Sequence, residues 1–241
     1  MKLYEERSYR GIIGSDLKRM TVIDEESDLD IQYSGELKGT EKEVSDLRNV
    51  LKSHILKEPE FLISLTPIAA ADDEEPMVSH MKRAAEKAGV GPMAAVAGAV
   101  AEYLANMHPD CEDLIIENGG DLYVRSSRDI RVLIYAGNSV LSNRIALEVR
   151  SCDTPLGICT SSGTVGHSLS FGKADAVVIV AKDTLLADAA ATATANRISA
   201  EKDIQGALDF ASGIDGVLGA VAVIGPKIGF WGNIKVVPVR P

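Results

Sequence analysis

Three features are scarce in this sequence of 241 residues: cysteine, basic charge and long apolar runs. The cysteines are Cys111, Cys152 and Cys159, and their odd number and spacing favour free thiols in a reducing compartment over a disulfide framework or a zinc site. The net charge of −10 argues against nucleic acids and anionic membranes as partners. No run is long enough to span a membrane, and residues 1–16 lack the apolar core of a signal peptide, so we expect a cytoplasmic protein.

The rest of the composition is that of a globular protein, with 46% hydrophobic residues, and it favours one domain over residues 1–241. Strand patterns predict a hairpin or meander within residues 1–38 and strands over 114–116, 122–124, 130–135, 145–149, 176–180, 217–224 and 234–239. Helical spacing predicts helices over 40–55, 77–88, 92–107, 184–197 and 203–212, with Thr40 and Glu43 at the spacing of a capping box. The acidic stretch Asp72–Glu75 is expected to form a solvated loop. This order of elements predicts an α+β layered fold, in which helices pack on a largely antiparallel sheet.

Two glycine-rich segments match nucleotide-binding motifs only in part. Gly89–Ala94 fits the dinucleotide fingerprint by letter, but the residues before it predict a helix, whereas the motif requires a strand. Gly166–Lys173 has one residue too many for a phosphate loop and an alanine where a magnesium-binding hydroxyl belongs. The four histidines lie far apart, and there is neither a Gly-x-Ser-x-Gly elbow nor a His-Glu-x-x-His helix, so hydrolase and zinc-enzyme classes find no support.

The first segment with unusual chemistry is Glu117–Asp121, a glycine turn between two predicted strands. Asn-Gly between strands is a strong hairpin signal, so turn geometry alone could explain Asn118, Gly119 and Gly120. Alternatively, the paired glycines let a ligand approach the backbone while Asp121 supplies a carboxylate.

The second segment, Cys159–Ser170, holds six hydroxyl side chains, two glycines and one histidine in twelve residues. Backbone N–H groups freed by glycine can form a nest for a phosphate, and hydroxyl donors can complete its shell without basic residues. The segment could equally be a polar surface loop. His167 could act as an acid–base group or have a structural role.

The third segment, Leu186–Thr194, predicts a helix of small side chains that contains Asp188 and Thr192. Their separation of four residues places a carboxylate and a hydroxyl on one helix face, and both are oxygen donors suited to Mg²⁺. The alternative is that Asp188 lies on a solvated face and Thr192 bonds to its own helix. An acidic residue in so apolar a stretch is costly when buried without a partner, which favours a metal or another partner.

These three segments, in this order, resemble the ApbE flavin-transferase superfamily. Its hallmarks are a Gly-Gly-Asp turn, a Thr-Ser-Gly stretch and an Ala-Asp-Ala-x-Ala-Thr helix, which correspond to Gly119–Asp121, Thr160–Gly163 and Ala187–Thr192. The resemblance covers residues 90–200 and implies an ApbE-like fold. With Ser27–Ile31 and Gly91–Gly98, the short chain resembles the cytoplasmic branch of that superfamily, uncharacterised protein family 0280.

The resemblance implies a cofactor and a site. Characterised members bind FAD and, with Mg²⁺, transfer its FMN part to a threonine of a partner protein, while others cleave FAD to FMN and AMP. By this resemblance Asp188 and Thr192 are metal ligands, and the catalytic groups are Asp121 and His167. The FAD or FMN site is lined by Asn118, Gly119, Gly120, Thr160, Ser161, Ser162, Gly163 and Thr164.

The sequence departs from the family in two places. A long segment that ends in a His-Ile-Ile-Asp-Pro motif is replaced by the short Thr164–Lys173, and Val96–Gly98 lacks the lysine expected before the glycine. Two hypotheses therefore stand. The first is a Mg²⁺-dependent protein that binds a flavin nucleotide or related diphosphate, as an FMN transferase or FAD pyrophosphatase. The second is a non-flavin accessory or sulfur-relay protein of anaerobic sulfide assimilation, with a thiolate at Cys159 or Cys152. The sequence gives no indication of the oligomeric state.

Overall fold

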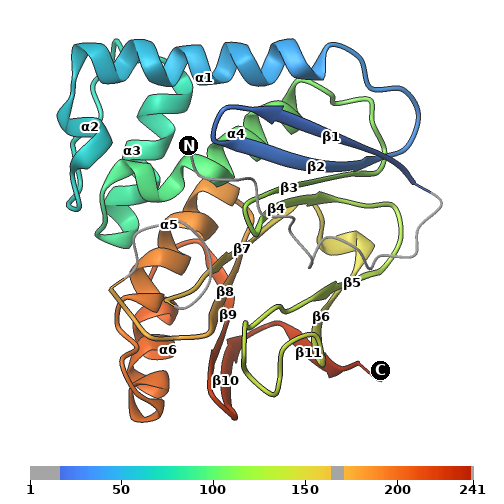
Figure 1. The fold of residues 1–241 in the computed structure, drawn as a ribbon, viewed down its shortest axis with the longest axis vertical. Helices are drawn as coiled ribbons and strands as arrows, with labels where there is room; N and C mark the ends of the chain where they lie inside the picture. Colours follow the sequence, from blue (N-terminus) through green and yellow to red (C-terminus); the bar gives the residue numbers. More distant parts are fainter. Residues whose placement is uncertain (1–16, 164–170, 240–241) are drawn as a thin grey trace.

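The computed structural model describes residues 17–163 and 171–239 and contains two antiparallel sheets. The main sheet has eight strands in the order β1–β2–β3–β4–β7–β8–β9–β10 (Figure 1). Its strands are β1 (Lys18–Asp24), β2 (Ser27–Tyr33), β3 (Leu114–Asn118), β4 (Asp121–Arg125), β7 (Leu156–Ser161), β8 (Ala176–Ala181), β9 (Val217–Ile224) and β10 (Lys227–Gly232). The small sheet has the order β11–β6–β5, with β5 (Ile130–Leu133), β6 (Ile145–Val149) and β11 (Lys235–Pro238).

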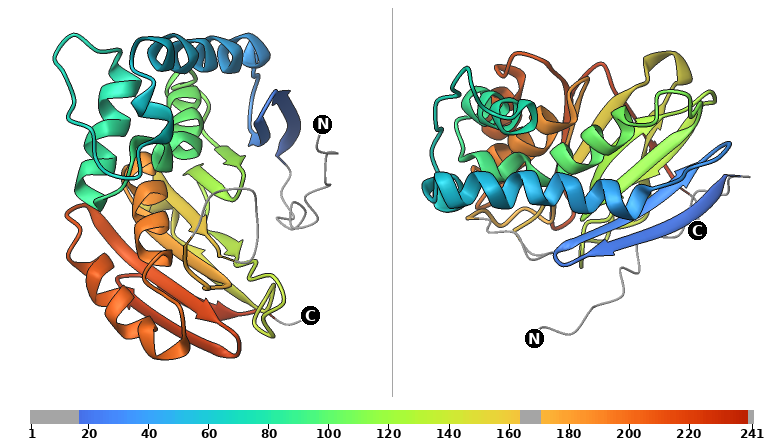
Figure 2. Two further views of the ribbon diagram at one scale, coloured as in Figure 1. Left: turned by 60° about the vertical axis from the view of Figure 1, so that its left-hand side comes forward. Right: turned by 90° about the horizontal axis from the view of Figure 1, so that it is seen from above.

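Helices cover one face of the main sheet, and the small sheet packs on the other face (Figures 1 and 2). The helices are α1 (Thr40–Lys57), α2 (Glu60–Ile63), α3 (Pro76–Ala88), α4 (Val96–Asn106), α5 (Thr184–Ala195) and α6 (Ile204–Ser212), with short 3₁₀ turns η1 (Pro92–Ala95), η2 (Ser151–Asp153) and η3 (Glu201–Asp203). This arrangement confirms the predicted α+β layered fold. Among the described helices, none alone is long and apolar enough to cross a membrane, although the bent pair Pro76–Ala88 and Pro92–Asn106 meets the criteria of length and composition when taken together.

Strand β8 lies at the centre of the layers, which explains its unbroken apolar sequence. Alternate side chains of a strand point to opposite faces. Val177 and Ile179 pack in the core beneath the helices, whereas Val178 and Val180 pack in the second core beneath the small sheet. Both faces of β8 are therefore buried, and no position on it is free to be polar.

Two strands were not predicted from the sequence, and both have unusual composition. β7 ends in Thr160 and Ser161, which were assigned to a phosphate-binding loop, but its pairing with β4 and β8 makes these residues part of the sheet. β10 contains two glycines and no regular alternation of polar and apolar residues, so its sequence does not indicate a strand. It forms because the chain turns back on β9.

Helix α1 confirms the predicted helix, but the predicted capping box is wrong. The N-cap is Gly39, in a left-handed conformation with no side-chain cap bond, and Thr40 is the first helical residue. Thr40 is buried, and within the part of the chain that the structure describes its hydroxyl has no hydrogen-bond partner. Glu43 instead accepts a hydrogen bond from His108 Nε2 at 2.7 Å, so its side chain joins α1 to the end of α4.

Helix α5 packs unusually close to its neighbours, and glycines on those neighbours allow this. A Cβ added to Gly157 on β7 would lie 2.5 Å from Thr184 Cα. A Cβ added to Gly98 on α4 would lie 2.5 Å from Thr184 O and 3.0 Å from Asp188 Cβ. Because real Cβ atoms do not approach other atoms so closely, any side chain at these positions would force α5 away from the sheet or from α4.

The first residues of α5 are held by two carboxylates and a histidine. Asp183 accepts a hydrogen bond from the Leu186 amide at 3.0 Å, and Glu102 accepts one from the Thr184 amide at 2.7 Å. His80 Nε2 lies 2.8 Å from the second oxygen of Asp183. These bonds satisfy backbone donors that the first turn of a helix leaves unpaired.

Substitution of two glycines tests the packing of α5. Gly157→Ala is expected to lower the free energy of unfolding by about 1–3 kcal/mol, because the methyl group would overlap the backbone of Thr184. Gly206 in α6 has no atom within 4 Å of an added Cβ, so Gly206→Ala is expected to raise the same free energy by about 0.5–1 kcal/mol. Urea unfolding measures both changes in the free energy of unfolding, and changes of the same sign in the two variants would contradict the packing argument.

The His80–Asp183 pair predicts a pH dependence of stability. Asp183 raises the pKa of His80 in the folded protein by hydrogen bonding, and this outweighs the lowering by burial. The folded state therefore binds more protons than the unfolded state. The stabilisation that the pair contributes is complete below a pH of about 6.5 and is lost as the pH rises through the raised pKa.

Asp183→Asn keeps an oxygen for the helix cap and removes the charge. As the pH rises through this interval, the free energy of unfolding is expected to fall less in the variant than in the natural protein. Urea unfolding at a pH below the interval and at a pH above it measures the difference. Asp203→Asn is the control, because Asp203 accepts hydrogen bonds from the backbone amides of Ser199 and Ala200. The same pH profile in the Asp183→Asn protein and the natural protein would exclude the His80 contribution.

Candidate functional site

The turn between β3 and β4 is a two-residue hairpin whose ends carry polar side chains. Asn118 pairs with Asp121 across the strands, and Gly119 and Gly120 have φ values of 72° and 103°. Primed hairpin turns require such positive φ values, so the hairpin interpretation of both glycines is confirmed. Asn118 and Asp121 are buried, and the Glu117 carboxylate accepts a hydrogen bond from the Gly120 amide at 2.6 Å.

Asp188 lies on α5 and faces the start of α4. Its Oδ2 accepts a hydrogen bond from the Gly98 amide at 2.8 Å, and its side chain is only 8% exposed. The prediction that Asp188 could lie on a solvated face is therefore wrong, and a buried partner is found. That partner is a helix N-terminus, where unpaired amides and the helix dipole favour negative charge.

The hairpin and Asp188 meet at the same point. Asn118 Nδ2 donates a hydrogen bond to Ala97 O at 3.3 Å, one residue before the amide that Asp188 binds. Asp121 is close enough to Asp188 to change its ionisation. The first and third segments singled out in the sequence are thus brought together, although they are about 70 residues apart in the chain.

Two acidic groups in one buried place repel each other. Burial raises the pKa of Asp188 well above its ordinary value, and the nearby negative charge of Asp121 raises this pKa further. The amides of Gly98 and Ala97 lower the pKa of Asp188 and offset part of this effect. The site therefore holds an excess of negative potential that either a proton or a bound cation can relieve.

The second segment joins the same site through Thr160. The Thr160 amide donates a hydrogen bond to Asp121 Oδ1 at 3.2 Å, so the end of β7 holds this carboxylate beside the hairpin. Ser161 follows on the same strand. The predicted loop at these two positions is therefore wrong, because both residues pair with the neighbouring strand β8.

Ser162 and Gly163 have partners within the protein. Ser162 Oγ donates to Ala174 O at 3.4 Å, and the Gly163 amide donates to the same oxygen at 2.9 Å. A Cβ added to Gly163 would lie 2.0 Å from Gly172 O, so the glycine permits a close approach of two backbone segments. Because the Gly163 amide is already bonded, it does not contribute the donor expected of a phosphate nest. Thr164 and His167 lie outside the described residues.

Thr192 lies one helical turn after Asp188 and is half-buried. The interval of four residues keeps it on the side of α5 that bears Asp188. Its role as a second oxygen ligand stays a prediction.

Three residues beside the site were not identified from the sequence. The amides of Ala97 and Gly98 act through the backbone, which leaves no signal in residue type. Thr184 is fully buried, and its hydroxyl has no hydrogen-bond partner among residues 17–163 and 171–239. The glycine at position 98, within a run of small residues, was the only available indication of a close contact.

Cys159 lies beside both carboxylates. Its side chain is fully buried, and Sγ lies 3.5 Å from Thr184 O. Burial raises the pKa of this thiol well above its ordinary value, and the charges of Asp121 and Asp188 raise it further. The predicted thiolate at Cys159 is thus opposed by its surroundings, because burial and the two nearby carboxylates outweigh the Leu122 amide, which lowers the pKa of the thiol.

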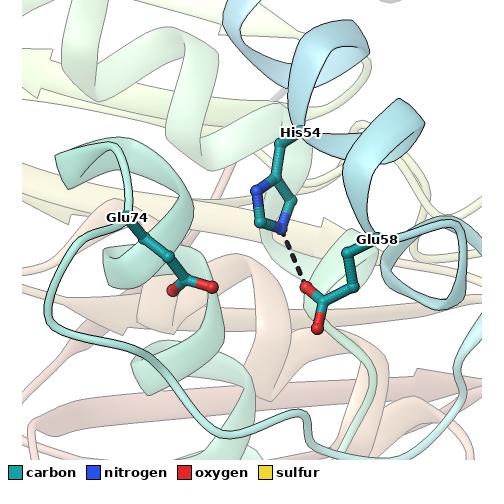
Figure 3. A group of neighbouring side chains, drawn as sticks. All are labelled: His54, Glu58 and Glu74. Atoms are coloured by element: carbon teal, nitrogen blue, oxygen red, sulfur yellow. Dashed lines mark hydrogen bonds and ion pairs between the residues drawn. The ribbon is translucent and has the colours of Figure 1, made fainter.

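A separate group of side chains has the spacing of a metal site. His54, Glu58 and Glu74 present candidate ligand atoms within 4.8 Å of one another (Figure 3). However, the Lys82 ammonium is 2% exposed, lies 2.7 Å from Glu58 and also pairs with Glu74. A cation already occupies the place between the carboxylates, so this cluster is an internal ion pair that joins α1 and α3. The predicted solvated loop is wrong at Glu74, which is held in this cluster.

Comparison with known proteins supports this assignment of the fold. The sequence matches the family described as AbpE bacteria over residues 11–224. It is 39% identical to a UPF0280 protein of Methanocaldococcus jannaschii, over 90% of this chain and 91% of that one. It is 40% identical to a UPF0280 protein of Methanopyrus kandleri, over 92% and 93% of the two chains.

Two solved structures share the fold at low sequence identity. The flavinyl transferase ApbE of Pseudomonas stutzeri, in its apo form, has a TM-score of 0.54 and 13% identity, over 95% of this chain and 97% of that one. The flavin transferase ApbE of Vibrio cholerae has a TM-score of 0.50 and 12% identity, over 92% and 97%. Identities this low establish the fold alone. The match over residues 11–224, the relatives at about 40% identity and the shared fold together show that the chain belongs to the AbpE bacteria family, in its ApbE-like UPF0280 branch.

Proposed function

We propose that this protein binds FAD, FMN or a related diphosphate ligand together with Mg²⁺ at the site formed by Asp188, Asp121 and the start of α4. The observation that carries this proposal is the position of Asp188, whose buried carboxylate accepts a hydrogen bond from the Gly98 amide near the Asp121 carboxylate. Two adjacent carboxylates in a place of low dielectric constant attract a divalent cation more strongly than the same groups would in water. The resemblance to flavin transferases supplies the class of ligand.

The donor set suits a hard cation. Asp188 would supply a carboxylate oxygen and Thr192 a hydroxyl oxygen one helical turn away on α5, and the nearby charge of Asp121 would add to the attraction. The Gly98 amide donates a hydrogen bond to Oδ2 of Asp188 and so orients the carboxylate that would bind the cation. The cation would offset the charge of a diphosphate and polarise its phosphorus–oxygen bonds, so the site needs no basic side chain to hold an anion.

The residues around the site suit transfer or cleavage of a flavin diphosphate. Asp121, held by the Thr160 amide, would accept the proton of an acceptor hydroxyl as that oxygen bonds to the phosphorus on the flavin side. The bond from this phosphorus to the bridging oxygen would break, and AMP would leave. With water as the acceptor, the products would be FMN and AMP. His167 is proposed as a second acid–base group, and a protein hydroxyl as the natural acceptor. The cytoplasmic location stays a prediction.

The substitution Asp188→Asn tests the metal role. The natural protein is expected to gain stability from FAD only when Mg²⁺ is present, by up to about 2.7 kcal/mol at one hundred times the dissociation constant. Asn has the shape of a protonated Asp and lacks the charge, so the variant is expected to fold and to lose the Mg²⁺-dependent part of the shift.

Thermal unfolding with FAD, Mg²⁺ and EDTA measures this effect. Asp209→Asn, on the exposed side of α6, is the matched control and should respond as the natural protein does. A natural protein that gains nothing from FAD and Mg²⁺, or an Asp188→Asn protein with an undiminished gain, would refute the proposal.

The sulfur-relay alternative and the diphosphate proposal differ in the cysteine reactivity that they predict. Cys152 is exposed, whereas Cys111 and Cys159 are buried. Iodoacetamide at neutral pH is therefore expected to modify Cys152 in the folded protein, and to modify the other two cysteines only after unfolding in guanidinium. Peptide mass spectrometry identifies the modified positions. Rapid modification of Cys159 in the folded protein would restore the thiolate hypothesis at the expense of the diphosphate site.

A further inference from the structure

Strand β10 forms an unprotected edge of the main sheet. It is the last strand in the order, it pairs with β9 over six residues without a bulge, and no strand within 17–163 or 171–239 pairs with its other side (Figures 1 and 2). Its large side chains are exposed, with Phe230 at 60%, Trp231 at 38% and Ile228 at 37%. Edge strands are usually blunted by charges, prolines or bulges, and the one charged residue of β10 is Lys227 at its start.

The hairpin geometry determines which groups of β10 face outward. β9 and β10 are joined by the two-residue turn Gly225–Pro226, with Gly225 at a φ of 54°. In such a turn the two flanking residues, Ile224 and Lys227, are hydrogen-bonded to each other through their backbones. Farther along the two strands, residue pairs without these bonds alternate with hydrogen-bonded pairs. The backbone groups of Gly229 and Trp231 therefore face β9, whereas those of Ile228 and Phe230 face away from the sheet and can bond to a further strand.

The two faces of β10 also differ. A Cβ added to Gly229 would lie 2.5 Å from Ile204 Cγ2 on α6, so Gly229 and the residues two positions away on either side, Lys227 and Trp231, point to the helix side. Ile228 and Phe230 point to the opposite face. An incoming strand thus meets two apolar side chains on one face, and one lysine and one tryptophan on the other.

We propose that the partner at this edge is a second copy of the chain, paired through β10 in antiparallel orientation about a two-fold axis at Gly229. In this register Ile228 lies opposite Phe230 of the second copy, and the reciprocal pair forms by symmetry. Lys227 lies opposite Trp231 of the second copy, where the ammonium can sit on the indole face. Gly229 lies opposite Gly229 of the second copy. The outward-facing backbone N–H and C=O groups of Ile228 and Phe230 form the hydrogen bonds between the copies.

This arrangement is self-complementary, which is what a two-fold interface requires. Ile228 and Phe230 each gain an apolar or aromatic neighbour, Trp231 gains a lysine, and the two Lys227 side chains lie at opposite ends of the paired segment. The strand order places β8 and β9 between this edge and the carboxylate site on β4, β7 and α5. Pairing would therefore leave that site open in both copies.

Sedimentation equilibrium and light scattering over a range of protein concentrations test the pairing. The natural protein is expected to form a dimer. Phe230→Lys and Ile228→Pro should be monomers at concentrations at which the natural protein is fully dimeric. Proline at position 228 removes an outward amide and no bond to β9, so the variant should keep the fold, which circular dichroism would verify.

Ile63→Lys on α2 and Ile23→Lys on β1 are matched controls, because these residues are 75% and 57% exposed at other places on the surface. Both controls should remain dimers. A natural protein that is monomeric at every concentration, or a dimer that persists in Phe230→Lys, would overturn the proposal, as would a dimer that a control substitution dissociates.

Cysteine cross-linking tests the register. In a Cys152→Ser background, which removes the exposed thiol, the double variant Ile228→Cys with Phe230→Cys should form a covalent dimer under mild oxidation. Phe230→Cys alone should cross-link much less, because the two copies of position 230 lie diagonally and not opposite each other. Stronger cross-linking of the single variant would exclude the Gly229-centred register.

Discussion

The close packing of α5 against α4 and β7 is the constraint on which the candidate site depends. Gly98 and Gly157 allow the backbone of Thr184 to approach both neighbours, and the alanines of α5 keep the helix surface small. This contact excludes water from Asp188 and brings its carboxylate to the first amides of α4. A bulkier helix would keep the same charges but place them in solvent, where their interaction with each other and with a cation would be weak.

The acidic pair Glu58 and Glu74 differs from the pair Asp188 and Asp121 in how its charge is offset. At Glu58 and Glu74 the Lys82 ammonium lies between the carboxylates, so this cluster needs no external ion. At Asp188 and Asp121 the contacts that lower the pKa of Asp188 are backbone amides, whose partial charges offset only part of the repulsion. The second group is therefore the one whose properties should depend on proton or cation binding.

The relation to known proteins has two levels, and the structure explains why they differ. Members of the same branch share about 40% of their residues over most of the chain, whereas the flavin transferases share 13% or less and retain the layered arrangement. A sheet whose central strands are buried on both faces tolerates many apolar sequences, provided that volume and alternation are kept. The fold can therefore be shared widely, while the chemistry must be established from the residues at the site.

Local patterns determined much of the secondary structure. The apolar alternation of β2, the periodicity of α1, the Asn-Gly turn before Asp121 and the small residues of α5 are properties of short segments, so they are visible in the sequence alone. The same patterns misplaced the helix cap at Thr40 and left β10 unassigned, since a capping bond and an edge strand depend on neighbours outside the segment.

Only the tertiary structure decided how the site is assembled. The sequence indicated Asp188 and Asp121 as acidic residues in unusual surroundings, but it could not show that Asp188 binds the amide of Gly98, 90 residues away. It also could not show that Cys159 lies near the charges of Asp121 and Asp188, or that Thr160 lies on a strand. Such contacts depend on how distant segments pack, and packing fixes the burial and the electrostatic potential from which each group takes its chemistry.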